Sequence, residues 1–180
     1  MGEDTPGLAV YYNLLRLLYD HHPIRDRVAG TVESIAEISA ETLYDCHKVF
    51  YAPSNMVLCV EGDVEPADIE RIARELLPAE RAPIPAADFG APEGLLPVGS
   101  FRSEAMEVSA PQFLIGLKLP EGLRGEQALR LRLTATLALR MLCGGSSPFF
   151  ARLYAEGLLT GDFDYEVDAA ADTLTVIVGG

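Results

Sequence analysis

The fold is decided by residues 113–147, which read FLIGLKLPEGLRGEQALRLRLTATLALRMLCGGSS. In residues 113–119 apolar side chains alternate with others, as a strand with one buried face requires. The leucine-rich residues 126–142 predict a long helix, and Gly144-Gly145 stands where such a helix should stop. Ser146 or Ser147 can cap a further helix that runs to about Gly157. This stretch is therefore expected to contain both a strand and helices.

Downstream, residues 163–167 and 174–178 predict two strands joined around residues 169–172. Upstream, residues 104–108 predict another strand, and Pro111 after it suggests a kink or a sheet edge. No repeat of fixed period is visible. We therefore predict an α+β fold, with antiparallel sheets and helices packed on one face of each sheet.

The N-terminal half continues the same alternation, in the order helix, helix, strand, helix. Helical spacing of apolar residues predicts the first helix, and a proline ends it. A serine can cap the second helix, and a proline suits the first position of the last one. A short apolar run between them favours a buried strand. These elements are expected at residues 9–19, 39–50, 56–60 and 66–77.

Residues 79–100 differ in composition from the rest of the chain, because they are rich in proline and alanine and their apolar residues show little periodicity. We therefore place a linker there, between a first domain at residues 1–78 and a second at residues 101–180.

Composition excludes several classes of protein. The chain has 180 residues, 49% of them hydrophobic and 23% charged, which argues against disorder. The net charge of −13, with no cluster of Lys and Arg, argues against nucleic-acid binding. This acidity favours solubility, and the alternative is a field that attracts basic peptides.

Cys46, Cys59 and Cys143 lie far apart in apolar surroundings, which suggests buried thiols in a reducing compartment and not a zinc site. No signal peptide opens the chain, so we expect a cytoplasmic protein. The most hydrophobic stretch, residues 129–143, contains three arginines and is too short to span a bilayer.

Candidate chemistry is sparse. His21-His22 with Asp26 could form a metal or acid–base cluster, but adjacent histidines point in different directions, so a surface turn explains them as well. His47 suits a helix residue better than a base. The run Gly144-Gly145-Ser146-Ser147 lacks the lysine of a phosphate loop and the spacing of a nucleophile elbow. The residues alone therefore indicate an acidic α+β protein without a complete catalytic constellation, and we assign no catalytic, cofactor-binding or metal residue.

Several stretches, in order along nearly the whole chain, resemble the insulinase/pitrilysin-type zinc metallopeptidases, in particular their bacterial branch. They include a glycine–aspartate turn and the helix–turn block after the paired serines. The matching residues are 22–23, 29–35, 38–43, 50–56, 61–64, 144–147 and the positions Phe149, Leu153, Tyr154, Glu156, Gly157 and Leu158.

The resemblance implies a zinc motif His-x-x-Glu-His, with a further downstream glutamate as ligand. The sequence contains no such motif, and its histidines are His21, His22 and His47. Glu3 lies near the place of the downstream glutamate but a few positions too late, so we do not assign it. Tyr154 stands where family members with substrate-gripping residues carry an arginine. The zinc ligands of the parent protein are thus expected outside this segment.

The resemblance also implies that residues 1–78 complete one metallopeptidase-like domain and that residues 101–180 begin a second, similarly folded one. We expect a non-catalytic segment of a zinc metalloendopeptidase, inactive alone, that contributes scaffold and chamber wall. The parent would act on peptides, with a homologous partner subunit as a further expectation. The alternatives are a structural or partner subunit of the same fold, which would bind peptides or a catalytic partner, and an unrelated α+β binding module.

Overall fold

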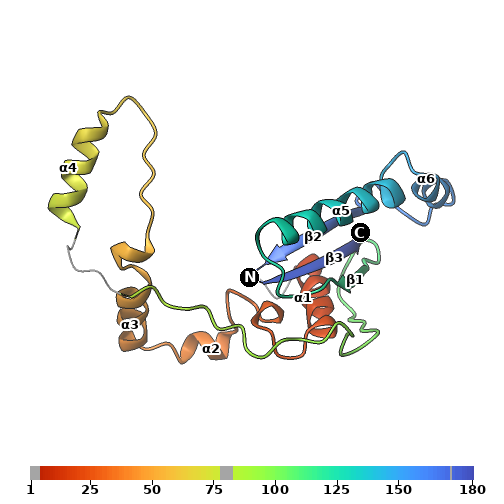
Figure 1. Ribbon diagram of the computed structural model, residues 1–180. Helices are drawn as coiled ribbons and strands as arrows, with labels where there is room; N and C mark the ends of the chain where they lie inside the picture. The colour runs from red at the N-terminus through yellow and green to blue at the C-terminus, as the bar shows by residue number, and fades with distance from the viewer. Residues whose placement is uncertain (1–4, 78–82, 171) are drawn as a thin grey trace. The chain divides into compact units, whose positions relative to one another are not determined.

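Figure 1 shows the computed structural model of the chain, which describes residues 5–77, 83–170 and 172–180. Contacts between residues divide the chain into two units. Residues 1–28 and 89–180 form the first unit, and residues 29–88 form the second. Among the described residues, Ala52 is the one buried apolar residue of the second unit, so the core lies in the first.

The first unit contains an antiparallel sheet of three strands. These are β1 (Leu114–Lys118), β2 (Asp164–Ala170) and β3 (Thr173–Gly179), in the order β1-β3-β2. Val176 in the central strand lies opposite Leu117 of β1 and Val167 of β2. β3 is buried along most of its length, whereas the two edge strands are more exposed.

One face of this sheet is covered by α1 (Pro6–Leu18). Leu14, Leu15 and Leu18 of the helix form a buried cluster with Ile177 of β3. The helix approaches closely because Gly116 of β1 has no side chain: a Cβ there would lie 2.7 Å from Leu18 Cδ1. After the helix, a one-turn 3-10 helix, η1 (Pro23–Arg25), changes the direction of the chain.

The opposite face is covered by α5 (Gly125–Cys143), which Figure 1 shows running along the strands. Leu131, Ala135 and Leu139 of this helix pack against a cluster formed by Val167, Leu174 and Val176. Successive residues of a strand point to opposite faces, so Val176 contacts α5 while its neighbour in β3 contacts α1. A further helix, α6 (Pro148–Ala155), follows α5.

The second unit consists of short helices and irregular chain. They are α2 (Val32–Ala36), α3 (Ala40–Phe50), the 3-10 helix η2 (Pro53–Asn55) and α4 (Pro66–Leu76). Thr31 and Ser34 form a capping box at the start of α2, and Ser39 caps α3 by accepting a hydrogen bond from the backbone N–H of Thr42. No described residue of these helices is buried.

The α+β class is confirmed, and most predicted elements are present. The helices expected at residues 9–19, 39–50, 66–77 and 126–142, the helix after Ser147, and the strands expected at residues 113–119, 163–167 and 174–178 all appear within a few residues. One detail of packing differs: α1 and α5 cover opposite faces of the sheet, and not one face.

Two predicted strands are wrong. Residues 56–60 and 104–108 have no regular secondary structure. Apolar composition is not sufficient for a strand, because a strand needs a neighbour that satisfies its backbone groups. Val57 is 96% exposed, so the first run does not find such a neighbour. In the second run, Glu104 instead accepts a hydrogen bond from the side-chain amide of Asn13 at 2.8 Å.

The predicted linker contains residues 78–82, which lie outside the described part of the chain. Residues 83–100 contain no helix or strand. Contacts group residues 1–28 with residues 89–180, whereas the sequence placed residues 1–78 in one domain. The assignment of 1–78 and 101–180 to two family domains stays a prediction.

Candidate functional site

Buried charges of the first unit gather where α1 ends. Pro23 disfavours helix in the residue before it, so the chain turns at residues 19–22 and leaves backbone N–H groups without helical partners. The carboxylate of Glu93 accepts hydrogen bonds from three of them, those of Asp20 at 3.0 Å, His21 at 2.7 Å and His22 at 2.8 Å. Glu93 thus joins the irregular segment 89–95 to the end of α1.

Lys118 at the end of β1 is the cation next to Glu93. Its Nζ lies 3.5 Å from Glu93 Oε2, and the two side chains are 2% and 3% exposed. Nζ also lies 5.0 Å from the centre of the Tyr19 ring. Burial alone would raise the pKa of Glu93, but the three backbone N–H donors and Lys118 outweigh it and lower that pKa to about 2. Glu93 is therefore an anion held in place by its surroundings.

His22 is buried beside this pair and is bonded at both ring nitrogens. Nδ1 accepts a hydrogen bond from the backbone N–H of Ile24 at 3.1 Å. Nε2 lies 3.0 Å from Asp172 Oδ1 and, in the tautomer that this network assigns, donates to it. The ring also stacks on Phe89, with ring centres 5.5 Å apart. Since neither nitrogen has a free lone pair, this His–Asp pair does not act as a general base in this arrangement.

A pocket of about 460 Å³ opens beside these residues. Its walls include His22, Phe89, Glu93, Glu121 and Asp172. Glu121 Oε2 accepts a hydrogen bond from the backbone N–H of Glu93 at 3.0 Å. Glu121 Oε1 is buried and has no partner among the described residues. The pocket walls thus carry three carboxylates, of which Glu93 is neutralised by Lys118.

The structure only partly brings together His21, His22 and Asp26, which the sequence offered as a possible cluster without assigning them a role. His21 is exposed, and its Nε2 lies 2.7 Å from the carbonyl oxygen of Ala91. Asp26 ends η1 through its backbone and contacts neither histidine by a described hydrogen bond. The acids bonded to His22 are Glu93 and Asp172, which are 71 and 150 residues from it. No local spacing signals these partners.

The other predicted candidates have structural roles. His47 stacks on Tyr51 within the second unit, with ring centres 5.0 Å apart. Ser147 accepts a hydrogen bond from the backbone N–H of Phe150 at 3.0 Å, so the serine run is a helix cap as expected. Tyr154 is 56% exposed and stacks on Phe150. Glu3 lies outside the described residues.

The expectation of buried thiols is wrong. Cys46 and Cys59 are exposed, Cys143 is half-buried, and all three are free. The apolar neighbours of Cys46 and Cys59 in sequence are themselves exposed, as Leu43 and Leu58 illustrate at 60% and 64%. Apolar neighbours in sequence predict the burial of a cysteine only when another helix or strand packs over them.

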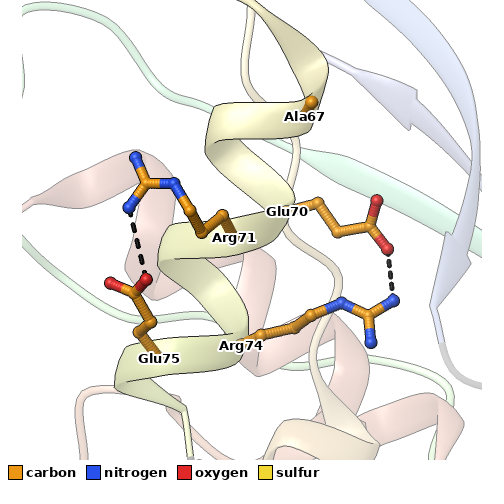
Figure 2. A pocket seen from close by; sticks show the side chains of 5 residues that line it. All are labelled: Ala67, Glu70, Arg71, Arg74 and Glu75. Carbon is orange, nitrogen blue, oxygen red and sulfur yellow. Dashed lines mark hydrogen bonds and ion pairs between the residues drawn. The ribbon is translucent and has the colours of Figure 1, made fainter.

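A shallow hollow on α4 contains charged side chains only of that one helix (Figure 2). Glu70 pairs with Arg74, and Arg71 pairs with Glu75 at 3.3 Å. All four side chains are more than half exposed. Such pairs one turn apart on a solvated helix contribute little to stability. We assign no chemistry to this hollow.

His22 does not fit a zinc site. A zinc ligand offers a free nitrogen lone pair, and both nitrogens of His22 are engaged. Within residues 5–77, 83–170 and 172–180, no three His, Cys, Asp or Glu side chains are grouped so as to hold a metal ion. In the same ranges, no helix is long and apolar enough to cross a membrane.

Comparison with known families identifies the chain. The profile of the peptidase M16 inactive domain matches residues 37–176. The chain belongs to the peptidase M16 family. The resemblance to insulinase-type metallopeptidases is thereby confirmed, and the matching region corresponds to the domain of that family described as inactive. The chain is thus a non-catalytic segment with a metallopeptidase fold.

The curated relatives of this chain are longer than the chain itself. YmfH of Bacillus subtilis, an uncharacterised zinc protease, is 32% identical over 184 residues, which cover 100% of this chain and 43% of the relative. ML0855 of Mycobacterium leprae, also described as an uncharacterised zinc protease, is 28% identical over 96% of this chain and 37% of its own length. The chain therefore spans about two fifths of the relatives that it matches.

Two solved structures agree with this chain in fold. A candidate M16-like peptidase from Alicyclobacillus acidocaldarius matches with a TM-score of 0.85 and 32% identity, over 100% of this chain and 43% of the other. A protease from Helicobacter pylori matches with a TM-score of 0.73 over 99% of this chain and 44% of the other, and at 17% identity it supports the fold alone.

Proposed function

We propose that this chain is the non-catalytic part of a zinc-dependent metalloendopeptidase and contributes scaffold and chamber wall to it. The observation that carries the proposal is the match of residues 37–176 to the M16 inactive domain. Relatives at 32% and 28% identity that are described as zinc proteases support the assignment of zinc chemistry to the parent protein. The substrates of the parent would be peptides.

The zinc ligands and the catalytic glutamate would lie in the parent protein outside this chain. The engaged nitrogens of His22 support this view, because a zinc site at this position would have to break two hydrogen bonds. Residues 1–78 would complete one metallopeptidase-like domain of the parent, and residues 101–180 would begin the next.

We place the parent protein in the cytoplasm. The three cysteines are free, and the exposed pair, Cys46 and Cys59, would be kept reduced in that compartment. A homologous partner subunit is a further part of the proposal, because the substrate-gripping arginine expected near Tyr154 would then come from another chain or domain.

The test is a side-by-side comparison of the full-length parent protein and this 180-residue chain. Zinc content is measured by elemental analysis, and cleavage is measured on a quenched fluorescent peptide. We expect stoichiometric zinc and chelator-sensitive cleavage with the parent only. Cleavage by the purified 180-residue chain would contradict its non-catalytic role.

The alternative is a structural or partner subunit of the same fold. It predicts a full-length protein without zinc and without the His-x-x-Glu-His motif, which binds a peptide or a catalytic partner but does not cleave. The large apolar side chains exposed on this chain, such as Leu133 and Leu137, suit this reading as well as the first. The zinc measurement separates the two readings.

A further inference from the structure

The second unit is inserted in the sequence of the first, so the chain passes between the units twice. The first unit consists of residues 1–28 and 89–180, and the second of residues 29–88. We call residues 23–28 the outgoing crossing, because they follow α1 and lead to the second unit. We call residues 83–88 the returning crossing, because they lead back to Phe89 of the first unit.

Two segments of the first unit, which we call the clasp, are bonded to each other next to these crossings. They are residues 20–22, which precede the outgoing crossing, and residues 89–93, which follow the returning one. The Glu93 carboxylate accepts hydrogen bonds from all three backbone N–H groups of residues 20–22. Nε2 of His21 donates to the carbonyl oxygen of Ala91 at 2.7 Å. Both polar side-chain and backbone groups therefore join the two segments.

The clasp is also attached to the sheet of the first unit. Lys118 at the end of β1 pairs with Glu93, and both side chains are buried. The ring of His22 stacks on Phe89, with ring centres 5.5 Å apart, and its Nε2 is bonded to Asp172 before β3. The two segments thus meet at one place, next to the ends of two strands.

The second unit contributes little to holding its own two ends together. Ala52 is its one buried apolar residue among those that the structure describes. Hydrophobic burial is the main favourable contribution to folding, and bringing the ends of a long segment together costs conformational entropy. The contacts that offset this cost are those of the clasp, within the first unit.

We propose that the clasp is a conformational device that holds both crossings at one place on the first unit, so that the two crossings open and close together. A change in residues 89–93 then loosens the outgoing crossing, and a change in residues 20–22 loosens the segment that follows the returning one. Such cooperative local opening occurs without unfolding of the sheet. The proposal goes beyond the proposed function and does not depend on zinc or on peptide cleavage.

The first test is limited proteolysis of the 180-residue chain by trypsin, which cleaves after Arg27 in the outgoing crossing. Phe89→Ala removes the ring that stacks on His22 but keeps the buried ion pair of Glu93. It should raise the rate of cleavage after Arg27 about threefold or more, because the clasp is open more of the time. Phe101→Ala is the matched control, since Phe101 is 80% exposed, and it should not change this rate.

The second test changes the other segment of the clasp. His21→Ala removes the bond to Ala91 and should speed hydrogen exchange of residues 89–93 about threefold, while the amides of β3 exchange as before. The proposal is overturned if either variant leaves its distant segment unchanged. It is also overturned if Phe89→Ala speeds cleavage after Arg140 of α5 as much as cleavage after Arg27, or if His21→Ala speeds exchange of β3 equally, because the whole first unit would then be unfolding.

Discussion

Glu93 lies in a stretch rich in proline and alanine, yet its side chain is only 3% exposed. The groups that hold the Glu93 carboxylate in place come from residues distant in sequence. They are the backbone N–H groups after α1 and the ammonium group of Lys118. Composition predicted a linker at this position, because composition does not reveal which backbone groups a carboxylate will meet. At the scale of single residues, the packing of the first unit therefore depends on long-range contacts that a local sequence pattern does not predict.

Glu93→Gln should destabilise the first unit by about 3 kcal/mol, because it leaves the buried Lys118 ammonium without its counter-charge and weakens the hydrogen bonds to three N–H groups. The measurement is urea unfolding followed by circular dichroism. Glu107→Gln, at an exposed position of the same unit, serves as the control and should change the free energy of unfolding little. An effect no larger than that of the control would contradict the role of Glu93, and adding Lys118→Met to Glu93→Gln should restore part of the loss.

Stability should depend on pH through the same carboxylate. The pKa of Glu93 is lowered from 4.5 to about 2 in the folded chain, so the folded state binds the proton more weakly than the unfolded state. The stabilisation is complete above pH 4.5 and is lost as the pH falls toward 2. Urea midpoints measured across this window should therefore fall more steeply in the wild type than in Glu93→Gln. Parallel curves would show that Glu93 is not responsible.

At the scale of elements, helices were predicted better than strands. The caps of α3 and α6 and the proline that begins α4 are local signals, and the structure contains all three helices. The strands of the sheet were found where the pairing partners are present. Residues 56–60 have the composition of a buried strand but no partner, so they remain irregular. A helix satisfies its own backbone, whereas a strand depends on another segment.

Ser147→Ala should cost about 1 kcal/mol of stability, because the hydroxyl group accepts a hydrogen bond from the first turn of α6 and is buried at 6% exposure. Ser146→Ala, at the exposed neighbouring position, should cost almost nothing. Urea unfolding of the two variants gives the comparison. Equal effects would mean that the cap has been assigned to the wrong serine.

Gly116→Ala should destabilise the packing of α1 on β1 by about 1–3 kcal/mol, the usual range for overpacking. The added methyl group would lie 2.7 Å from Leu18 Cδ1 and 2.9 Å from Leu14 Cδ1. Gly94→Ala is the control, since nothing lies within 4 Å of its Cβ position. Thermal unfolding should separate the two variants, and a stabilised Gly116→Ala protein would show that α1 is not packed as described.

At the scale of the whole molecule, burial is uneven. The sheet of the first unit is covered on both faces, and Leu15 and Thr175 are completely buried. The helices of the second unit contain no described buried residue, and side chains such as Tyr44 and Leu76 are 76% and 78% exposed. Hydrophobic burial is the main favourable contribution to folding, so the two units should differ in local stability.

Hydrogen exchange measured by mass spectrometry should show this difference. Amides of β3, which is paired on both sides, should be the slowest to exchange in this chain, and those of α3 should exchange much faster. In the full-length parent, α3 should gain protection if other parts of the protein cover its exposed apolar residues. Similar protection of β3 and α3 in the 180-residue chain would contradict the uneven distribution of stability.

The sequence by itself determined the class of the protein, most of its helices and the strands of one sheet. It also supported the assignment to the family. Helix caps, glycines at helix ends and the periodicity of apolar residues are local properties, so they can be recognised in a part of a protein. Only the tertiary structure decided that α1 and α5 sandwich β3, that His22 is bonded at both nitrogens, and that Glu93 and Lys118 form a buried pair. Glu93 and Lys118 are 25 positions apart and His22 and Asp172 are 150 positions apart, while the placement of the two helices depends on which face of a strand each one covers. A short window of sequence does not encode such pairings.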